Sequence, residues 1–162
     1  MFTTTPFSTW ELNDDLLAGL ESIGWEFATQ VQKETIPLAL SGNDVIGQAR
    51  TGSGKTAAFG LPTMNACQPT GELQALILAP TRELANQVAE ELSNIQGNTG
   101  LNIQTVYGGT DLEKQAKNLQ AGVDIIVGTP GRVMDMTERG FINLEKPTFF
   151  VLDEADRMLD MG

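Results

Sequence analysis

The stretch DVIGQARTGSGKT at residues 44–56 decides the fold expected for this chain. It starts as an apolar strand at 44–47, passes through a glycine-rich turn and opens a helix near residue 55. Gly52 and Gly54 let the backbone curl so that successive N–H groups point inward at an anion, and the helix adds the positive end of its dipole. A strand, a turn and a helix in this order predict a phosphate-binding loop in an α/β protein.

The side chains that follow these glycines indicate a nucleotide as the anion. Lys55 supplies a mobile charge for the β- and γ-phosphates, and the Thr56 hydroxyl can bind Mg²⁺. The strict pattern G-x-x-x-x-G-K-[ST] needs glycine at position 49, where this chain has alanine, although the phosphate-binding chemistry stays intact. The alternative is a glycine-rich turn with an incidental lysine. The residues predicted to bind the nucleotide here are Ala49, Arg50, Thr51, Gly52, Ser53, Gly54, Lys55 and Thr56.

Outward from this loop, short apolar runs alternate with longer amphipathic stretches. Further strands are expected at 74–79, 102–107, 123–127 and 148–152, and helices at 13–22, 30–40, 55–66, 82–96, 111–120 and 131–139. Strands separated by helices imply crossover connections, and therefore a parallel sheet covered by helices on both faces. Asn13 and Thr110 are predicted to cap two of the helices, because each is followed by acidic residues.

Composition excludes several classes of protein. The chain has 162 residues, a size typical of one domain, and no apolar run approaches the ~20 residues that span a bilayer. It has no histidine, which excludes a Ser/His or Cys/His nucleophile, and its one cysteine, Cys67, fits a reducing compartment such as the cytoplasm. With 21 acidic and 10 basic residues the net charge is −11, so any nucleic-acid contact must come from a few local groups.

A second chemical signal lies about 100 residues after the glycine-rich turn. The apolar strand at 149–152 runs into the acidic residues Asp153, Glu154 and Asp156. Asp153 can hold Mg²⁺, which prefers oxygen ligands, and Glu154 can orient and deprotonate a water molecule that attacks the γ-phosphorus. The alternative is an acidic turn that caps the next helix. No Asn-Lys-x-Asp element is present, which disfavours a GTPase.

Taken in order, these motifs resemble the first RecA-like domain of the DEAD-box ATP-dependent RNA helicases, over residues 7–162. Asp153-Glu154-Ala155-Asp156 is similar to the motif that names the family, and the loop at 49–56 is similar to its phosphate-binding motif, with Arg50 where glutamine is usual. The resemblance implies a RecA-like P-loop NTPase fold with ATP and Mg²⁺ as cofactors. It also implies catalytic roles for Lys55, Asp153 and Glu154, and a role for Asp156 in coupling to a second RecA-like domain.

The segment before the loop resembles the family's adenine-reading Q motif. Gln32 would hydrogen-bond the adenine edge through its amide, and Phe7, which lies 17 residues before Gly24, would stack on the base. Thr29 matches the motif's threonine, whereas Ala28 and Gln30 stand where proline is common. The resemblance therefore predicts a Q-motif segment at 1–42 packed on an ATP-binding core at 43–162.

Three further turns resemble the family's RNA-contacting motifs. Each follows a predicted strand and offers N–H groups, hydroxyl groups or an arginine that can grip a phosphate backbone without reading bases. The alternative to RNA contact is that these residues serve only as ordinary turn and helix-cap residues. The residues expected to contact RNA are Pro80, Thr81, Arg82, Gly108, Gly109, Thr129, Pro130, Gly131 and Arg132.

The resemblance also predicts an amino-terminal fragment of a longer protein. The family continues with a Ser-Ala-Thr motif on a further strand and with a second RecA-like domain. That further strand is expected between the strands at 44–47 and 148–152, so its loss predicts a gap there. The chain alone is expected to bind nucleotide but not to unwind RNA. Two alternatives stay open, namely another P-loop ATPase such as a DNA translocase, and an ATP-gated RNA clamp with little turnover.

Overall fold

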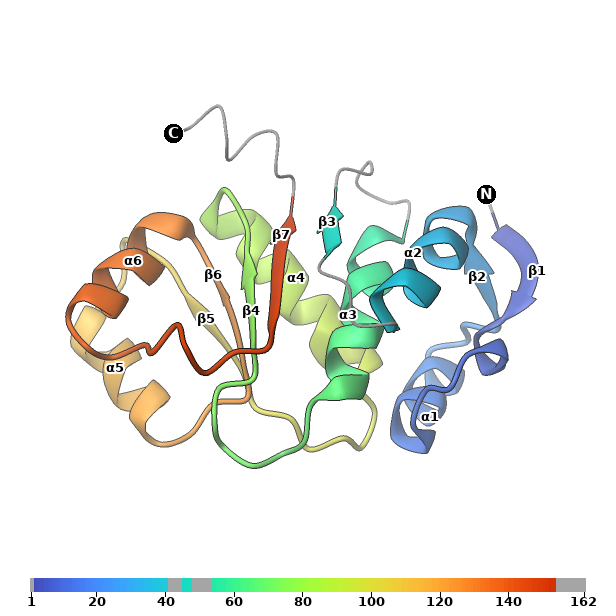
Figure 1. Cartoon of the computed structure of the whole chain (residues 1–162), viewed down its shortest axis with the longest axis horizontal. Helices are drawn as coiled ribbons and strands as arrows, with labels where there is room; N and C mark the ends of the chain where they lie inside the picture. The colour runs from blue at the N-terminus through green and yellow to red at the C-terminus, as the bar shows by residue number, and fades with distance from the viewer. Residues whose placement is uncertain (1, 41–44, 48–53, 154–162) are drawn as a thin grey trace.

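A five-stranded parallel sheet forms the centre of the computed structural model, which describes residues 2–40, 45–47 and 54–153 (Figure 1). The strand order across the sheet is β3 (Val45–Gly47), β7 (Phe149–Asp153), β4 (Ala75–Leu78), β6 (Ile125–Gly128) and β5 (Ile103–Val106). Every neighbouring pair of these strands is parallel. The α/β class predicted from the alternating pattern is therefore confirmed.

Helices cover both faces of this sheet. Successive side chains of a strand point to opposite faces, so neighbouring residues of β4 pack against different helices. Ile77 of β4 lies in the core with α3 (Lys55–Ala66) and α4 (Arg82–Ile95). Its neighbour Leu76 packs with α5 (Leu112–Gln120) and α6 (Pro130–Glu138). None of the helices in the described ranges is both long and apolar enough to cross a membrane.

Side-chain caps fix where the helices begin. The Asn13 side chain accepts a hydrogen bond from the Leu16 N–H at the start of α1 (Asp14–Ser22), which confirms the predicted cap. The predicted cap at Thr110 is wrong by one residue, because the Asp111 carboxylate accepts from the first N–H groups of α5. The Thr110 hydroxyl instead donates to the Tyr107 carbonyl, at 3.1 Å, and so holds the preceding turn.

The amino-terminal segment contains elements that the hydrophobic pattern did not predict. β1 (Phe2–Pro6) and β2 (Phe27–Thr29) pair antiparallel, and a short 3-10 helix, η1 (Phe7–Thr9), follows β1. β1 reads Phe-Thr-Thr-Thr-Pro, which has no alternation of apolar and polar residues, and β2 has only three residues. The pairing register also shifts within the pair. α2 (Gln30–Leu40) follows β2 directly and packs on α3. The segment thus shares the core of the sheet domain, while the predicted boundary at 42/43 lies outside the described residues.

The strand order corrects one expectation. A gap was expected between the strands at 44–47 and 148–152, but β3 pairs directly with β7, with Val45 opposite Val151 and Gly47 opposite Asp153. Buried backbone N–H and C=O groups need partners, and the two strands supply them to each other. The carboxyl ends of β3 and β7 therefore lie side by side.

Glycine allows α1 to approach the end of α4 closely. A Cβ atom on Gly19 would lie 2.5 Å from the Ile95 carbonyl oxygen and 2.7 Å from the Gly97 nitrogen. Both neighbours are backbone atoms, so they cannot turn away as a side chain would. This contact anchors the amino-terminal segment to the sheet domain.

We expect Gly19→Ala to lower the free energy of unfolding by about 1–3 kcal/mol, because the added methyl group must push two backbone segments apart. Urea unfolding followed by circular dichroism measures the change. Gly131→Ala is the matched control, since a Cβ atom there meets nothing within 4 Å. Equal stability of the two variants would contradict the close approach of α1 and α4.

Candidate functional site

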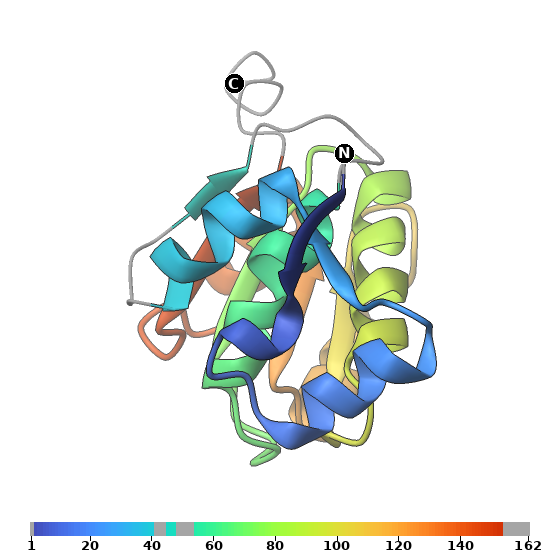
Figure 2. The ribbon, with the colours of Figure 1, turned by 90° about the vertical axis from the view of Figure 1, so that its right-hand side faces the viewer.

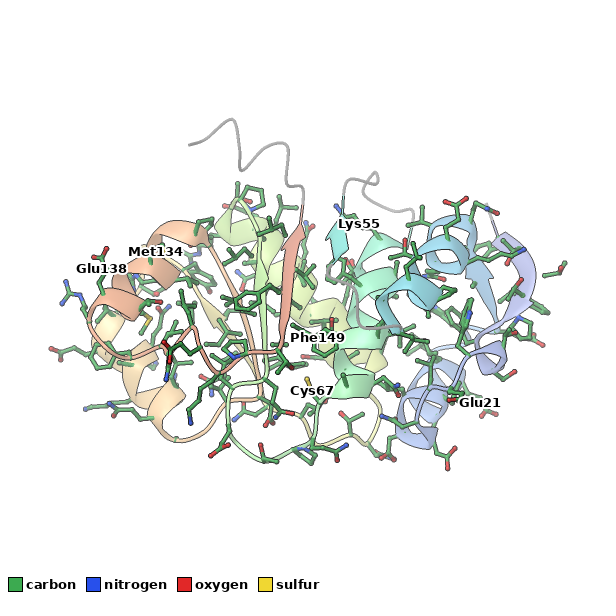
Figure 3. The ribbon with its side chains drawn as sticks, in the orientation of Figure 1. Glu21, Lys55, Cys67, Met134, Glu138 and Phe149 are labelled. Carbon is green, nitrogen blue, oxygen red and sulfur yellow. The ribbon has the colours of Figure 1, made fainter. Side chains whose placement is uncertain are left out.

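Two of the residues predicted for the site, Lys55 and Asp153, lie near the carboxyl edge of the sheet. β3 and β7 end there at the register pair Gly47 and Asp153, and α3 begins at Lys55 near the same edge. In Figure 3, Lys55 lies beside β3 at the upper edge, whereas Cys67 lies at the opposite end of α3. Ala49, Arg50, Thr51, Gly52, Ser53, Glu154 and Asp156 lie outside the described residues.

Gln32 links the amino-terminal segment to the start of α3. Its Oε1 accepts from the Thr29 N–H at 2.8 Å, and its Nε2 donates to the Gly54 carbonyl at 3.2 Å. The side chain is 1% exposed. An amide has two N–H donors and two acceptor lone pairs, so one of each remains beyond these two bonds. The group predicted to read a base is thus oriented by the protein, and it keeps hydrogen-bonding capacity.

Gly54 has no room for a side chain. Its φ of +85° is in the left-handed region, and a Cβ atom would lie 2.6 Å from Gln32 Nε2 and 2.8 Å from Thr29 Oγ1. Gly54 is also the N-cap of α3 and provides no side-chain cap. The positive end of α3 therefore remains suited to an anion.

A cavity of about 620 Å³ opens beside this glycine. Gln32, Gly54, Lys55 and Thr56 form part of its wall. The β1–β2 pair, the segment before β2, α2, the start of α3 and one side of α4 all contribute to it. The β1–β2 pair, α3 and α4 also lie together in Figure 2. The rest of the wall consists of Phe2, Ile23, Trp25, Phe27, Thr29, Leu84, Gln87, Val88, Glu91, Asn94 and Ile95. A wall that combines a lysine, hydroxyl and amide groups with aromatic side chains suits a ligand with a charged group and a flat ring.

Phe7 does not line this cavity in the structure. It is 3% exposed, stacks on Trp25 with ring centroids 6.4 Å apart, and meets Trp10 edge-on at 6.3 Å. Trp25 does line the cavity and is 38% exposed. The sequence reasoning missed Trp25, although an aromatic residue seven positions before Gln32 was a visible signal.

The predicted RNA-contacting turns come together at one place. Arg82 lies over the Tyr107 ring, 4.9 Å from its centroid. Arg132 donates to the Thr110 carbonyl at 3.2 and 3.3 Å. The turn at 107–110, which holds Gly108 and Gly109, therefore contacts both arginines.

Other residues of these turns have structural contacts. Thr81 caps α4 by accepting from the Leu84 N–H, and the Thr129 N–H donates to the Val106 carbonyl at 2.9 Å. Pro130 opens α6, while Pro80 is buried and Gly131 is exposed. These contacts fix the backbone that carries the two arginines.

Cys67 lies at the other edge of the sheet, where its buried thiol stays protonated and unreactive. Burial, together with the nearby Asp124 carboxylate, raises the pKa of the thiol from 9.0 to about 12. Asp124 is buried and accepts from the Gly71 and Asn102 N–H groups at 2.8 and 2.7 Å. The cysteine is a packing residue, and Asp124 ties together the loops at this edge.

The raised pKa of Cys67 predicts a loss of stability at high pH. The unfolded chain releases the thiol proton near pH 9.0 while the folded chain keeps it up to about pH 12, so the free energy of unfolding falls between these values. Urea unfolding at several pH values from 8 upward measures this slope. In Cys67→Ala, which has no proton to release, the slope should be shallower; an unchanged slope would contradict the assignment.

The sequence model of the DEAD/DEAH box helicase family matches residues 29–162 of this chain. The chain therefore belongs to this family. It is 51% identical over 159 residues to the RNA helicase CrhR of Synechocystis sp.. The aligned region covers 98% of this chain and 32% of that relative. It is 50% identical over 157 residues to the DEAD-box ATP-dependent RNA helicase CshA of Streptococcus pneumoniae serotype 4, covering 96% of this chain and 30% of that relative.

Solved structures agree with this assignment. The chain matches a DEAD box protein from the hyperthermophile Methanococcus jannaschii with a TM-score of 0.92 and 42% identity, over 100% of this chain and 44% of that one. The predicted RecA-like fold is thereby confirmed. The chain spans about a third of the length of the curated relatives it matches.

Proposed function

We propose that this chain binds ATP and RNA as the first part of an ATP-dependent RNA helicase. One arrangement carries the proposal: Gln32, Gly54 and Lys55 lie on the wall of one cavity. α3 begins at Lys55, near the edge of the sheet where β3 ends opposite Asp153. The relatives described above are named RNA helicases, which supports the same reading.

The cavity fits the parts of ATP in order. The base lies against Trp25 and Phe27, and the free donor and acceptor of Gln32 read its edge. Phe7 supports Trp25 from the core side by stacking on it. Lys55 binds the β- and γ-phosphates, with the N–H groups of the loop at 49–54 and the positive end of α3.

The oxygen donors at the sheet edge fit Mg²⁺, which binds hydroxyl and carboxylate groups and keeps several waters. Thr56, which lines the cavity, and Asp153, at the end of β7, would hold the ion. When bound, it neutralises charge on the β- and γ-phosphates. Glu154, the next residue in the sequence, would orient and deprotonate the attacking water.

RNA binds across the turns that carry Arg82 and Arg132. Their guanidinium groups and the exposed N–H groups near Gly108, Gly109 and Gly131 suit backbone phosphates. Backbone contacts carry no sequence information directly, so binding is independent of RNA sequence. Tertiary placement of a few cations also explains how a chain of net charge −11 binds a polyanion.

Unwinding itself requires a second RecA-like domain, with which Asp156 couples, because ATP must bias two states of a two-domain clamp. A cytoplasmic location fits the single reduced cysteine. An RNA clamp with little turnover uses the same binding groups. Steady-state ATP turnover of the full-length protein, with and without RNA, separates the two: a helicase shows RNA-stimulated turnover, whereas a clamp does not.

The experiment that tests ATP binding is titration calorimetry of this chain with MgATP. Lys55→Ala is expected to weaken binding by roughly tenfold or more, because the phosphates lose a charge-assisted contact. Lys33→Ala is the matched control, since Lys33 is exposed on α2 and does not line the cavity. Equal affinity of the Lys55 variant and the unaltered chain would refute the proposed phosphate site.

The base site has its own test. Trp25→Ala is expected to weaken MgATP binding by roughly tenfold, in line with ~1–3 kcal/mol for stacking of a base on an aromatic side chain, and Trp25→Phe by much less. Titration calorimetry gives both affinities. Trp10→Phe serves as the control, because Trp10 also touches Phe7 but lies away from the cavity. An unchanged affinity in Trp25→Ala would place the base elsewhere.

A further inference from the structure

Two side chains outside the predicted RNA motifs hold the two arginines. The Tyr107 ring supports the Arg82 guanidinium, at 4.9 Å from the ring centroid. Gln115 of α5 accepts a hydrogen bond from Arg132 through its Oε1, at 3.1 Å. Neither Tyr107 nor Gln115 was predicted from the sequence as part of a site.

The Gln115 amide connects the whole turn to Arg132. Its Nε2 donates to the Tyr107 carbonyl at 3.2 Å and to the Thr110 hydroxyl. Arg132 in turn donates to the Thr110 carbonyl as well as to Gln115. One side chain thus fixes both ends of the turn at 107–110 and the arginine beside it.

Both arginines are held by neutral groups. In the described part of the chain, Arg82 and Arg132 form no ion pair, whereas the exposed Arg139 pairs with Asp135 at 3.0 Å. An aromatic ring, an amide oxygen and a carbonyl oxygen orient a cation without cancelling its charge. In a chain with 21 acidic residues, this keeps two positive charges available at one surface.

We propose that Gln115 and Tyr107 are positioning residues that pre-orient Arg132 and Arg82 for the backbone phosphates of single-stranded RNA. The inference rests on the proposed function, because it needs these arginines to bind RNA. A long arginine side chain loses rotamer freedom when it binds, and neutral contacts that order it beforehand reduce that loss. Each residue therefore acts through its arginine and does not itself bind the phosphate.

The test measures the affinity of this chain for a fluorescein-labelled single-stranded oligouridylate by anisotropy, at several salt concentrations. Gln115→Ala and Arg132→Ala are each expected to weaken binding about fivefold at low salt, and the double variant no more than Arg132→Ala alone. Arg132→Ala should also reduce the salt slope by about 0.7, the value for one phosphate contact on a single strand.

Tyr107 is tested by a conservative pair. Tyr107→Phe keeps the ring and should bind RNA within twofold of the unaltered chain, whereas Tyr107→Leu should weaken binding about threefold. Tyr107→Leu should add no loss to Arg82→Ala. Gln104→Ala is the control for folding effects, because Gln104 also donates to backbone carbonyls, of Asn118 and Gly122, but contacts no arginine.

The outcomes separate this inference from the proposed function. If Arg82→Ala and Arg132→Ala both leave RNA affinity unchanged, the proposed RNA surface is wrong and the inference falls with it. If Arg132→Ala weakens binding but Gln115→Ala does not, or if their losses add in full, only the positioning role is overturned. If Gln104→Ala lowers RNA affinity as much as Gln115→Ala does, the loss comes from a general effect on folding, and the positioning role is likewise overturned.

Discussion

Parallel pairing of the strands is the constraint on which the rest of this structure depends. Because β3, β7, β4, β6 and β5 all run in one direction, the loops that follow them emerge at one edge of the sheet. Gly47 and Asp153 come from parts of the sequence about 100 residues apart, yet the register of β3 and β7 makes them neighbours. An antiparallel arrangement of the same segments would divide the site between two edges.

Gln32 and Gly54 connect the amino-terminal segment to the start of α3. The Gln32 amide is buried, and the backbone it binds belongs to β2 on one side and to the start of α3 on the other. Gly54 accepts this close approach because it has no Cβ atom. The amino-terminal segment is therefore part of the cavity wall. In the proposed function, the base contacts the same side chain that hydrogen-bonds to the Gly54 carbonyl at the start of α3.

Sequence patterns predicted the long elements well and the short ones poorly. The helices of the sheet domain are long enough to show a period, and strands such as β4 and β6 are continuous apolar runs. α2 and α3 begin and end at the residues expected. β1 has three consecutive threonines and no alternation of apolar and polar residues, and β2 has only three residues. The cap of α5 lies at Asp111, because Thr110 bonds within the preceding turn. The direct pairing of β3 with β7 depends on which strands are present to pair, which a local pattern does not contain.

The sequence by itself determined that this chain carries a glycine-rich loop ending in Lys-Thr, an acidic pair after an apolar run, and turns with two arginines. These are properties of neighbouring residues. Only the tertiary structure decided that Trp25 lines the cavity while Phe7 is buried behind it in the core. It also decided that Gln115 and Tyr107, from different elements, hold the two arginines. The physical reason is that burial and side-chain contact depend on distances between segments remote in sequence, which packing sets once the sheet has formed.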